Sequence, residues 1–199
     1  MARARLKLHI TKSQLETDFG FYCKELELAG MIEKYNPNPM TRVISEPVYY
    51  KSIARTKKEK TKTLLNRHEY TPDVVIKWKK EARNIFWRRW EDEKYPDVPF
   101  LANYNKEKDF YYTIVEVKPG FDMENMTRLF SINQKWIMAS MGLYVQKVVM
   151  CNDERSIFAK TFTPIKWMTT PIQGKPRTIK FEVRGIGQYI AKRKELLNL

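Results

Sequence analysis

The sequence predicts a protein of the α/β (α+β) class: a small βαβαβ unit over residues 111–172, with helical and irregular basic extensions on either side. Two observations lead to this prediction. Within 111–172, apolar residues alternate between the period of two that strands show and the period of about 3.6 that helices show. Outside it, lysine and arginine are concentrated. Right-handed crossovers would place both helices on one face of a three-stranded sheet.

The pattern divides the chain into four parts. We expect a basic N-terminal extension with short helices and an irregular arm (1–70), a helix with a connecting loop (71–110), the compact unit (111–172) and a basic C-terminal extension (173–199).

The charge balance indicates which partners to expect. The 199 residues include 37 Lys and Arg against 23 Asp and Glu, a formal net charge of +14. Such a field concentrates polyanions, so nucleic acid is the first expected partner and an anionic membrane surface the second. No apolar run reaches the about 20 residues that span a bilayer, so the chain is expected to be soluble or peripheral. Cys23 and Cys151 lie far apart without histidines at metal-ligand spacing, which predicts a reducing compartment and no structural zinc.

The N-terminal extension opens with MARARLKLHITKSQ, which is compatible with a mitochondrial address or with a basic tail lying on a polyanion. Apolar residues at roughly helical spacing over 11–35 then predict one or two short helices, capped by Thr11 or Ser13. Three prolines remove backbone donors from the stretch 36–52, which is therefore expected to be an irregular arm.

The stretch 51–68, KSIARTKKEKTKTLLNRH, has Glu59 as its single acid. A charge run is usually a solvated face. Because this one is so one-sided and is flanked by an arm with little core of its own, contact with phosphate is the interpretation we favour.

Residues 71–95 predict a long helix, with Thr71 as its cap and Pro72 at the first helical position. Tryptophans at helical spacing are more often packing residues than platforms for bases. We therefore take Arg88 and Arg89, rather than Trp87, as the candidate RNA contacts.

The compact unit is predicted to contain five elements in order. They are a strand in FYYTIVEV (110–117), a helix capped by Asp122 and ending at Gly142, a strand over 144–151, a helix from Asp153 through Phe162 capped by Asn152 or Asp153, and an extended piece WMTTPI (167–172). The helical stripes should face the sheet, so the predicted core includes Leu129, Phe130, Trp136, Ile137, Phe158 and Phe162. The C-terminal extension adds a predicted strand TIKFEV (178–183) and a short basic helix.

Catalytic motifs are absent from the sequence. It has no phosphate-binding glycine loop, no HExxH and no GxSxG, and its two histidines, His9 and His68, lie in basic segments. Asp122 and Glu124 are explained by a helix start, although they could pair as metal ligands. We expect no enzyme, no cofactor and no metal.

With these elements laid out, residues 111–172 resemble the bacterial and mitochondrial ribosomal protein L-thirty family. The resemblance rests on a strand running into a proline turn in YYTIVEVKPG, on SMGL (140–143) in the place of the family's LGL signature, and on the valine-rich VQKVVM. It implies a βαβαβ fold that binds rRNA in a large ribosomal subunit. Asp122 and Glu124 stand where family members are usually basic, which leaves Lys118 and Arg128 for the implied rRNA contact at the first helix.

The leading hypothesis is therefore a structural protein of the mitochondrial large ribosomal subunit, located in the matrix, with rRNA and neighbouring ribosomal proteins as partners. The alternative is an accessory structural subunit of another organellar complex, such as a respiratory-chain assembly. Basic arms that order on rRNA would explain both halves of the sequence. The predicted RNA-binding residues are Arg3, Arg5, Lys7, Lys57, Lys58, Lys60, Lys62, Arg67, Arg88, Arg89, Lys118, Arg128, Lys175 and Arg177.

Overall fold

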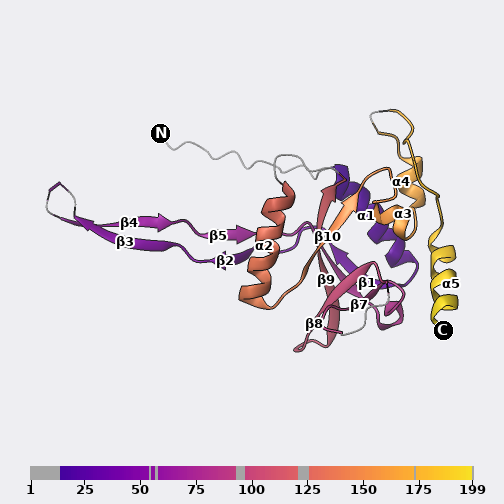
Figure 1. Ribbon diagram of the computed structural model, residues 1–199, viewed down its shortest axis with the longest axis horizontal. Helices are drawn as coiled ribbons and strands as arrows, with labels where there is room; N and C mark the ends of the chain where they lie inside the picture. The colour runs from indigo at the N-terminus through magenta and orange to yellow at the C-terminus, as the bar shows by residue number, and fades with distance from the viewer. Residues whose placement is uncertain are drawn as a thin grey trace.

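A computed structural model describes residues 14–53, 55–56, 58–92, 97–120, 126–172 and 174–198. It is a mixed α+β protein, so the predicted class is confirmed. A six-stranded mixed sheet forms the body, and a long two-stranded arm projects from it (Figure 1).

The sheet is built around the long strand β9 (Phe110–Pro119), which has neighbours on both sides. The strand order is β1 (Ile32–Asn36), β6 (Val74–Trp78), β9, β8 (Phe100–Asn105) and β7 (Trp87–Arg89), and β10 (Val145–Met150) pairs with the second half of β9. β10 runs parallel to β9, with Val145 opposite Ile114, and β6 and β8 run antiparallel to it.

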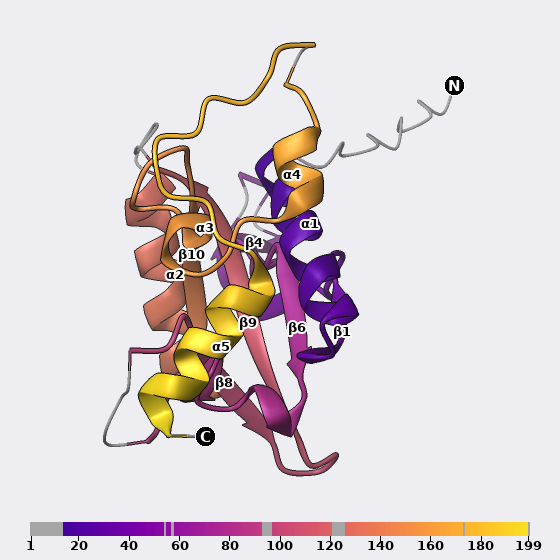
Figure 2. The same ribbon diagram turned by 90° about the vertical axis from the view of Figure 1, so that its right-hand side faces the viewer.

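Helices cover both faces of this sheet (Figure 2). On one face, α2 (Met126–Met141) packs Phe130 and Ile137 against Ile114 and Val145. The larger core lies on the other face under α1 (Gln14–Leu28), α3 (Ile157–Lys160), α4 (Ile165–Thr169) and α5 (Ile186–Leu197). The prediction that both helices of the compact unit lie on one face is wrong, because α3 and α2 pack against opposite faces.

Two of the predicted three strands are present in 111–172, and the third is not. Residues 165–169 form α4 instead of an extended strand, so the unit is not a simple βαβαβ fold. The sheet is completed by β1, β6, β7 and β8 from outside the unit. Residues 178–183 likewise form no strand with any described residue.

The predicted helix over 71–95 is wrong. Val74, Ile76 and Trp78 are buried and alternate with less buried neighbours, because this segment is β6, an inner strand between β1 and β9. The Trp78 indole Nε1 donates to Thr113 Oγ1 across the strand pair at 2.8 Å. A short 3₁₀ turn (Lys80–Ala82) and β7 follow.

The other elements of the body agree largely with the sequence. The helix α1, the basic helix α5 and the strands β9 and β10 are confirmed, and α2 is followed by Gly142 with a φ of +63°. The helical prediction over 11–35 is wrong at its end, where pairing with β6 makes Ile32–Asn36 the strand β1. Ser156 caps α3 in place of Asn152 or Asp153, with its side chain accepting from the Phe158 N–H. The proposed caps Thr11, Ser13 and Asp122 lie outside the described residues.

The predicted core is confirmed for four of its six members. Phe130, Ile137, Phe158 and Phe162 are buried, whereas Leu129 is 59% and Trp136 is 42% exposed. The stripe on α2 is wider than the surface of the sheet that it covers, and its outer edge faces away from the sheet.

The arm is regular, contrary to the prediction of an irregular segment. It consists of two consecutive antiparallel pairs: β2 (Arg42–Ser45) with β5 (His68–Tyr70), and β3 (Val48–Ile53) with β4 (Glu59–Leu65). Pro47 falls between β2 and β3, where no ladder hydrogen bond is needed. Cross-strand hydrogen bonds thus order a segment whose composition indicates no core.

Candidate nucleic-acid interface

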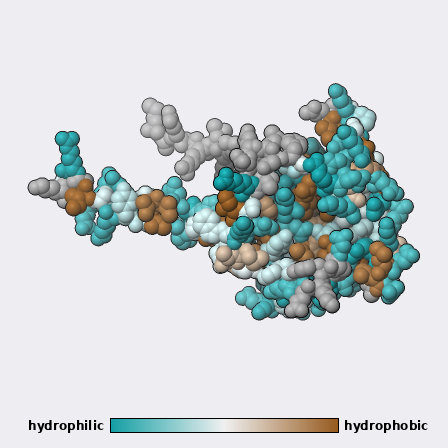
Figure 3. Space-filling view, viewed as in Figure 1, coloured by the Kyte–Doolittle hydropathy of each residue, from teal (hydrophilic) through white to brown (hydrophobic). Residues whose placement is uncertain are grey.

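The outer part of the arm is exposed on both faces. Every residue of β4 is exposed, and so is every residue of β3 except the half-buried Ser52. Hydrophobic and hydrophilic patches both lie along it (Figure 3), and it carries exposed large apolar and aromatic side chains. They are Val48, Tyr49, Tyr50, Ile53, Leu64 and Leu65. An isolated two-stranded ribbon is marginally stable in water, so the arm has the character of a surface that a partner covers.

The register separates the charges of the ribbon by face. Tyr50 lies opposite Lys62, and Ser52 lies opposite Lys60, so both lysines point to one side. On the other side, Lys51 Nζ is 3.2 Å from Glu59 Oε2. Lys60 and Lys62 have no acidic partner among the described residues. One face of the ribbon therefore carries an aromatic ring and two unneutralised cations.

The arm also holds Lys58 and Arg67 from the predicted set. Lys58 is exposed next to the tip, and Arg67 Nε lies 3.0 Å from Glu69 Oε1 near the base. The structure thus brings Lys58, Lys60, Lys62 and Arg67 onto one projecting element. Lys57, together with Arg3, Arg5 and Lys7, lies outside the described residues.

Arg88 and Arg89 are half-buried in β7, and both side chains already have partners within the protein. Arg88 Nε donates to Asn84 Oδ1 at 3.0 Å. Arg89 is paired with Glu91, and its guanidinium carbon lies 5.7 Å from the ring centre of Tyr104. These contacts hold the edge of the sheet, so we leave both arginines out of the proposed interface.

Arg177 has a structural partner deep in the protein. Its Nη1 and Nη2 each donate to one oxygen of Asp18 at 2.7 Å, and the two side chains are 3% and 5% exposed. Trp167 Nε1 donates to the same carboxylate at 3.0 Å, and its ring lies 4.8 Å below the guanidinium. This cluster ties the C-terminal segment to α1 and leaves Arg177 inaccessible to RNA. Lys175, nearby in the chain, is exposed, and so is Arg128 on α2.

Lys118 belongs to a polar cluster where the arm joins the sheet. Glu116 accepts hydrogen bonds from Tyr70 Oη at 2.6 Å and from Lys118 Nζ at 2.7 Å. Asp73 Oδ2 accepts from the Val117 N–H at 2.7 Å, and burial, together with the Glu116 carboxylate, raises the pKa of Asp73 to about 7. Lys118 therefore neutralises a buried carboxylate of the protein.

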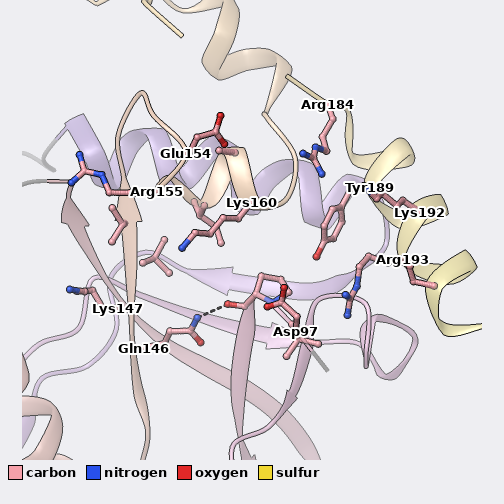
Figure 4. A pocket seen from close by; sticks show the side chains of 17 residues that line it. Asp97, Gln146, Lys147, Glu154, Arg155, Lys160, Arg184, Tyr189, Lys192 and Arg193 are labelled. Atoms are coloured by element: carbon pink, nitrogen blue, oxygen red, sulfur yellow. Dashed lines mark hydrogen bonds between the residues drawn. The ribbon is translucent and has the colours of Figure 1, made fainter. Parts of the chain in front are cut away.

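A cationic cleft is a feature that the sequence did not indicate (Figure 4). It has a volume of about 610 Å³ and lies between β10, α3 and α5. Its cationic lining residues are Lys147, Arg155, Lys160, Arg184, Lys192 and Arg193. The sequence indicated Lys192 and Arg193 through the basic C-terminal helix. The other four lie apart from one another in the sequence, and only the fold brings them together.

The described residues offer little for metal chemistry. None of their His, Cys, Asp and Glu side chains form a group of three that could hold a metal ion. Burial raises the pKa of the Cys23 thiol, so this cysteine is held in its unreactive protonated form. Within the same ranges, no helix has the length and apolar character needed to cross a membrane.

Comparison of the chain with protein-family models, with curated proteins and with solved structures finds no match.

Proposed function

We propose that this chain is a structural RNA-binding protein of a ribonucleoprotein particle, and that its arm is the main RNA contact. The observation that carries the proposal is the projecting ribbon whose one face presents Tyr50, Lys60 and Lys62 without an acidic partner in the part of the chain that the structure describes. Cations on an extended element contact phosphates along a polyanion, and a tyrosine ring packs on ribose or bases.

The particle that we propose is the large subunit of a mitochondrial ribosome. Its support is the resemblance of residues 111–172 to the L-thirty family, which rests on YYTIVEVKPG, SMGL and VQKVVM, together with the net charge of +14 and the exposed basic arm. The order β9, α2, β10 is the part of the family pattern that the chain retains, with α4 in the place of the closing strand.

Neighbouring ribosomal proteins are proposed as the partners of the outer face of α2. Leu129, Ile132 and Trp136 recur there at helical spacing and are all exposed. Apolar side chains in a row are typical of the core of a protein interface. The same face would also suit a respiratory-chain assembly, so the arm and its charges are what distinguish the two candidates.

The test is the salt dependence of binding to mitochondrial large-subunit rRNA. Neutralised phosphates release counterions, so each lost contact lowers the slope of log K against log salt by about 0.9 in duplex-like regions. We expect the fourfold variant Lys57→Ala, Lys58→Ala, Lys60→Ala, Lys62→Ala to flatten this slope by roughly 2 to 4 units.

Lys106 and Lys108 supply the matched control, because both are exposed in the turn between β8 and β9, away from the arm. Their double alanine variant should leave the slope within about half a unit of the wild-type value. A fourfold arm variant with the wild-type slope would show that the arm does not hold phosphate, and would favour a protein-bound assembly.

A further inference from the structure

The cleft between β10, α3 and α5 has more cationic than acidic side chains among the lining residues that the structure describes. Asp97 and Glu154 are the acidic residues among its described lining, against six cationic ones. Arg155 is engaged by Asp153 at 2.7 Å, and Arg193 Nη2 donates to the Asn84 carbonyl at 2.8 Å. Internal partners therefore account for two of the six cations.

The other four cations of the cleft have no bonded partner in the described part of the chain. Lys147, Lys160, Arg184 and Lys192 form no side-chain hydrogen bond or ion pair with any described residue. They come from β10, from α3, from the segment before α5 and from α5 itself (Figure 4). Cations arranged around a cleft in this way repel one another, and an anion placed between them relieves that repulsion.

Apolar side chains line the cleft beside the cationic ones. Val148, Ile157 and Ala159 are buried residues that line it, and Tyr189 is buried among them. The Tyr189 hydroxyl donates to the Ile85 carbonyl at 3.3 Å, and burial raises the pKa of Tyr189 to about 12. The lining thus combines apolar side chains with cationic ones, which fits a ligand that has both an apolar part and several negative charges.

We propose that this cleft binds a short single-stranded segment of RNA, with phosphates at the four unpartnered cations and a base or ribose against the apolar lining. The inference rests on the proposed function and names a second site for the same ligand class. A cleft of about 610 Å³ has the size of a small-molecule site and is too small for a duplex, whereas a nucleotide of a single strand fits. Charges from four segments suit a chain of phosphates better than one small anion.

The experiment uses the full chain, with hexauridylate as the single-stranded probe and a short RNA duplex as the second probe. The cleft variant carries Lys147→Glu, Lys160→Glu and Lys192→Glu, all at exposed positions. Its control carries Lys34→Glu, Lys106→Glu and Lys108→Glu, which are also exposed and change the net charge equally. We expect the cleft variant to bind hexauridylate roughly tenfold or more weakly than the control, with a salt slope lower by about 2 units.

A second measurement locates the probe directly. Hexauridylate that contains 4-thiouridine should cross-link on irradiation to peptides from 146–160 and 184–196, which line the cleft. Cross-links confined to the arm would overturn the inference, and so would equal binding by the cleft variant and its control. Preferential binding of a hexaglutamate peptide would also overturn it, in favour of an acidic protein segment.

These outcomes separate the cleft from the arm. If the cleft substitutions leave the affinity for hexauridylate unchanged while the affinity for the duplex still depends on the arm lysines, the cleft inference fails and the proposed function stands. A wild-type chain that binds neither probe overturns both. Thermal unfolding of each variant verifies that the substituted chains are folded.

Discussion

Arg177 illustrates how a single residue can change its expected role once the fold is known. Its position in a basic C-terminal segment indicated phosphate binding, but its guanidinium is buried against Asp18 and Trp167. Removing one partner of a buried ion pair leaves the other charge uncompensated, which costs about 3 to 5 kcal/mol. We expect Arg177→Ala to lower the free energy of unfolding in urea by that amount.

Lys175→Ala is the matched control for this prediction, because Lys175 lies two positions away and is exposed. It should change the free energy of unfolding by no more than about 0.5 kcal/mol. Equal stabilities of the two variants would contradict a structural role for Arg177.

Asp73 makes the stability depend on pH. The fold raises its pKa from 3.8 to about 7, so the protonated form is favoured in the folded chain. Below pH about 3 the group is protonated in both the folded and the unfolded chain, so it does not change the free energy of unfolding. As the pH rises from about 4 to about 7, Asp73 ionises in the unfolded chain before it ionises in the folded chain. The free energy of unfolding therefore falls over this range and stops falling once the folded carboxyl is also ionised.

Asp73→Asn removes this ionisation. Because the site is partly screened by solvent, we expect the variant to be more stable than the wild type by about 1 to 2 kcal/mol at pH 8. The difference should vanish below pH about 3, where the carboxyl is protonated in both states. Urea unfolding of both chains across this range measures it, and a constant difference at all pH values would contradict the assignment to Asp73.

At the scale of the element, α2 has an inner and an outer apolar face. Ile137 is fully buried against the sheet, whereas Leu129 is largely exposed. In the isolated chain, Ile137→Ala should cost about 2 to 5 kcal/mol of unfolding free energy and Leu129→Ala about 0.5 kcal/mol or less. Chemical denaturation of the two variants compares these costs. Similar losses would mean that the outer face is also covered within the protein.

The two faces of α2 also show what the periodicity of the sequence can predict and what it cannot. It located the helix and its inner residues Phe130 and Ile137, because both lie in the centre of the stripe. It did not show where the sheet ends beneath the helix, since that depends on strands contributed by distant segments. Leu129 and Trp136 therefore fit the helical pattern but are not part of the core.

β6 was mistaken for a helix for a related reason. The residues Val75, Trp78 and Ala82 fit a helical spacing, while Val74, Ile76 and Trp78 fit a strand. Short apolar runs satisfy both periods, and the β-branched run that favours a strand was outweighed by the cap signals at Thr71 and Pro72. Pairing with β9 on one side and β1 on the other decides the conformation.

On the scale of the whole molecule, the basic excess predicted a polyanion partner but not the surfaces that would meet it. Of the described candidates, the lysines of the arm remain exposed, while Arg89, Lys118 and Arg177 are paired with acids. Sequence shows the number of charges, and only the fold shows which of them are neutralised internally. The cleft of Lys147, Lys160, Arg184 and Lys192 was missed for the same reason.

The most direct test of an RNA-bound arm is a structure of the assembled mitochondrial large ribosomal subunit that contains this chain. We predict that β3 and β4 lie against rRNA, with Lys60 and Lys62 within ion-pair distance of phosphate oxygens. A particle in which residues 58–67 face only protein or solvent would contradict the proposal, and so would the absence of the chain from the subunit after sedimentation in high salt.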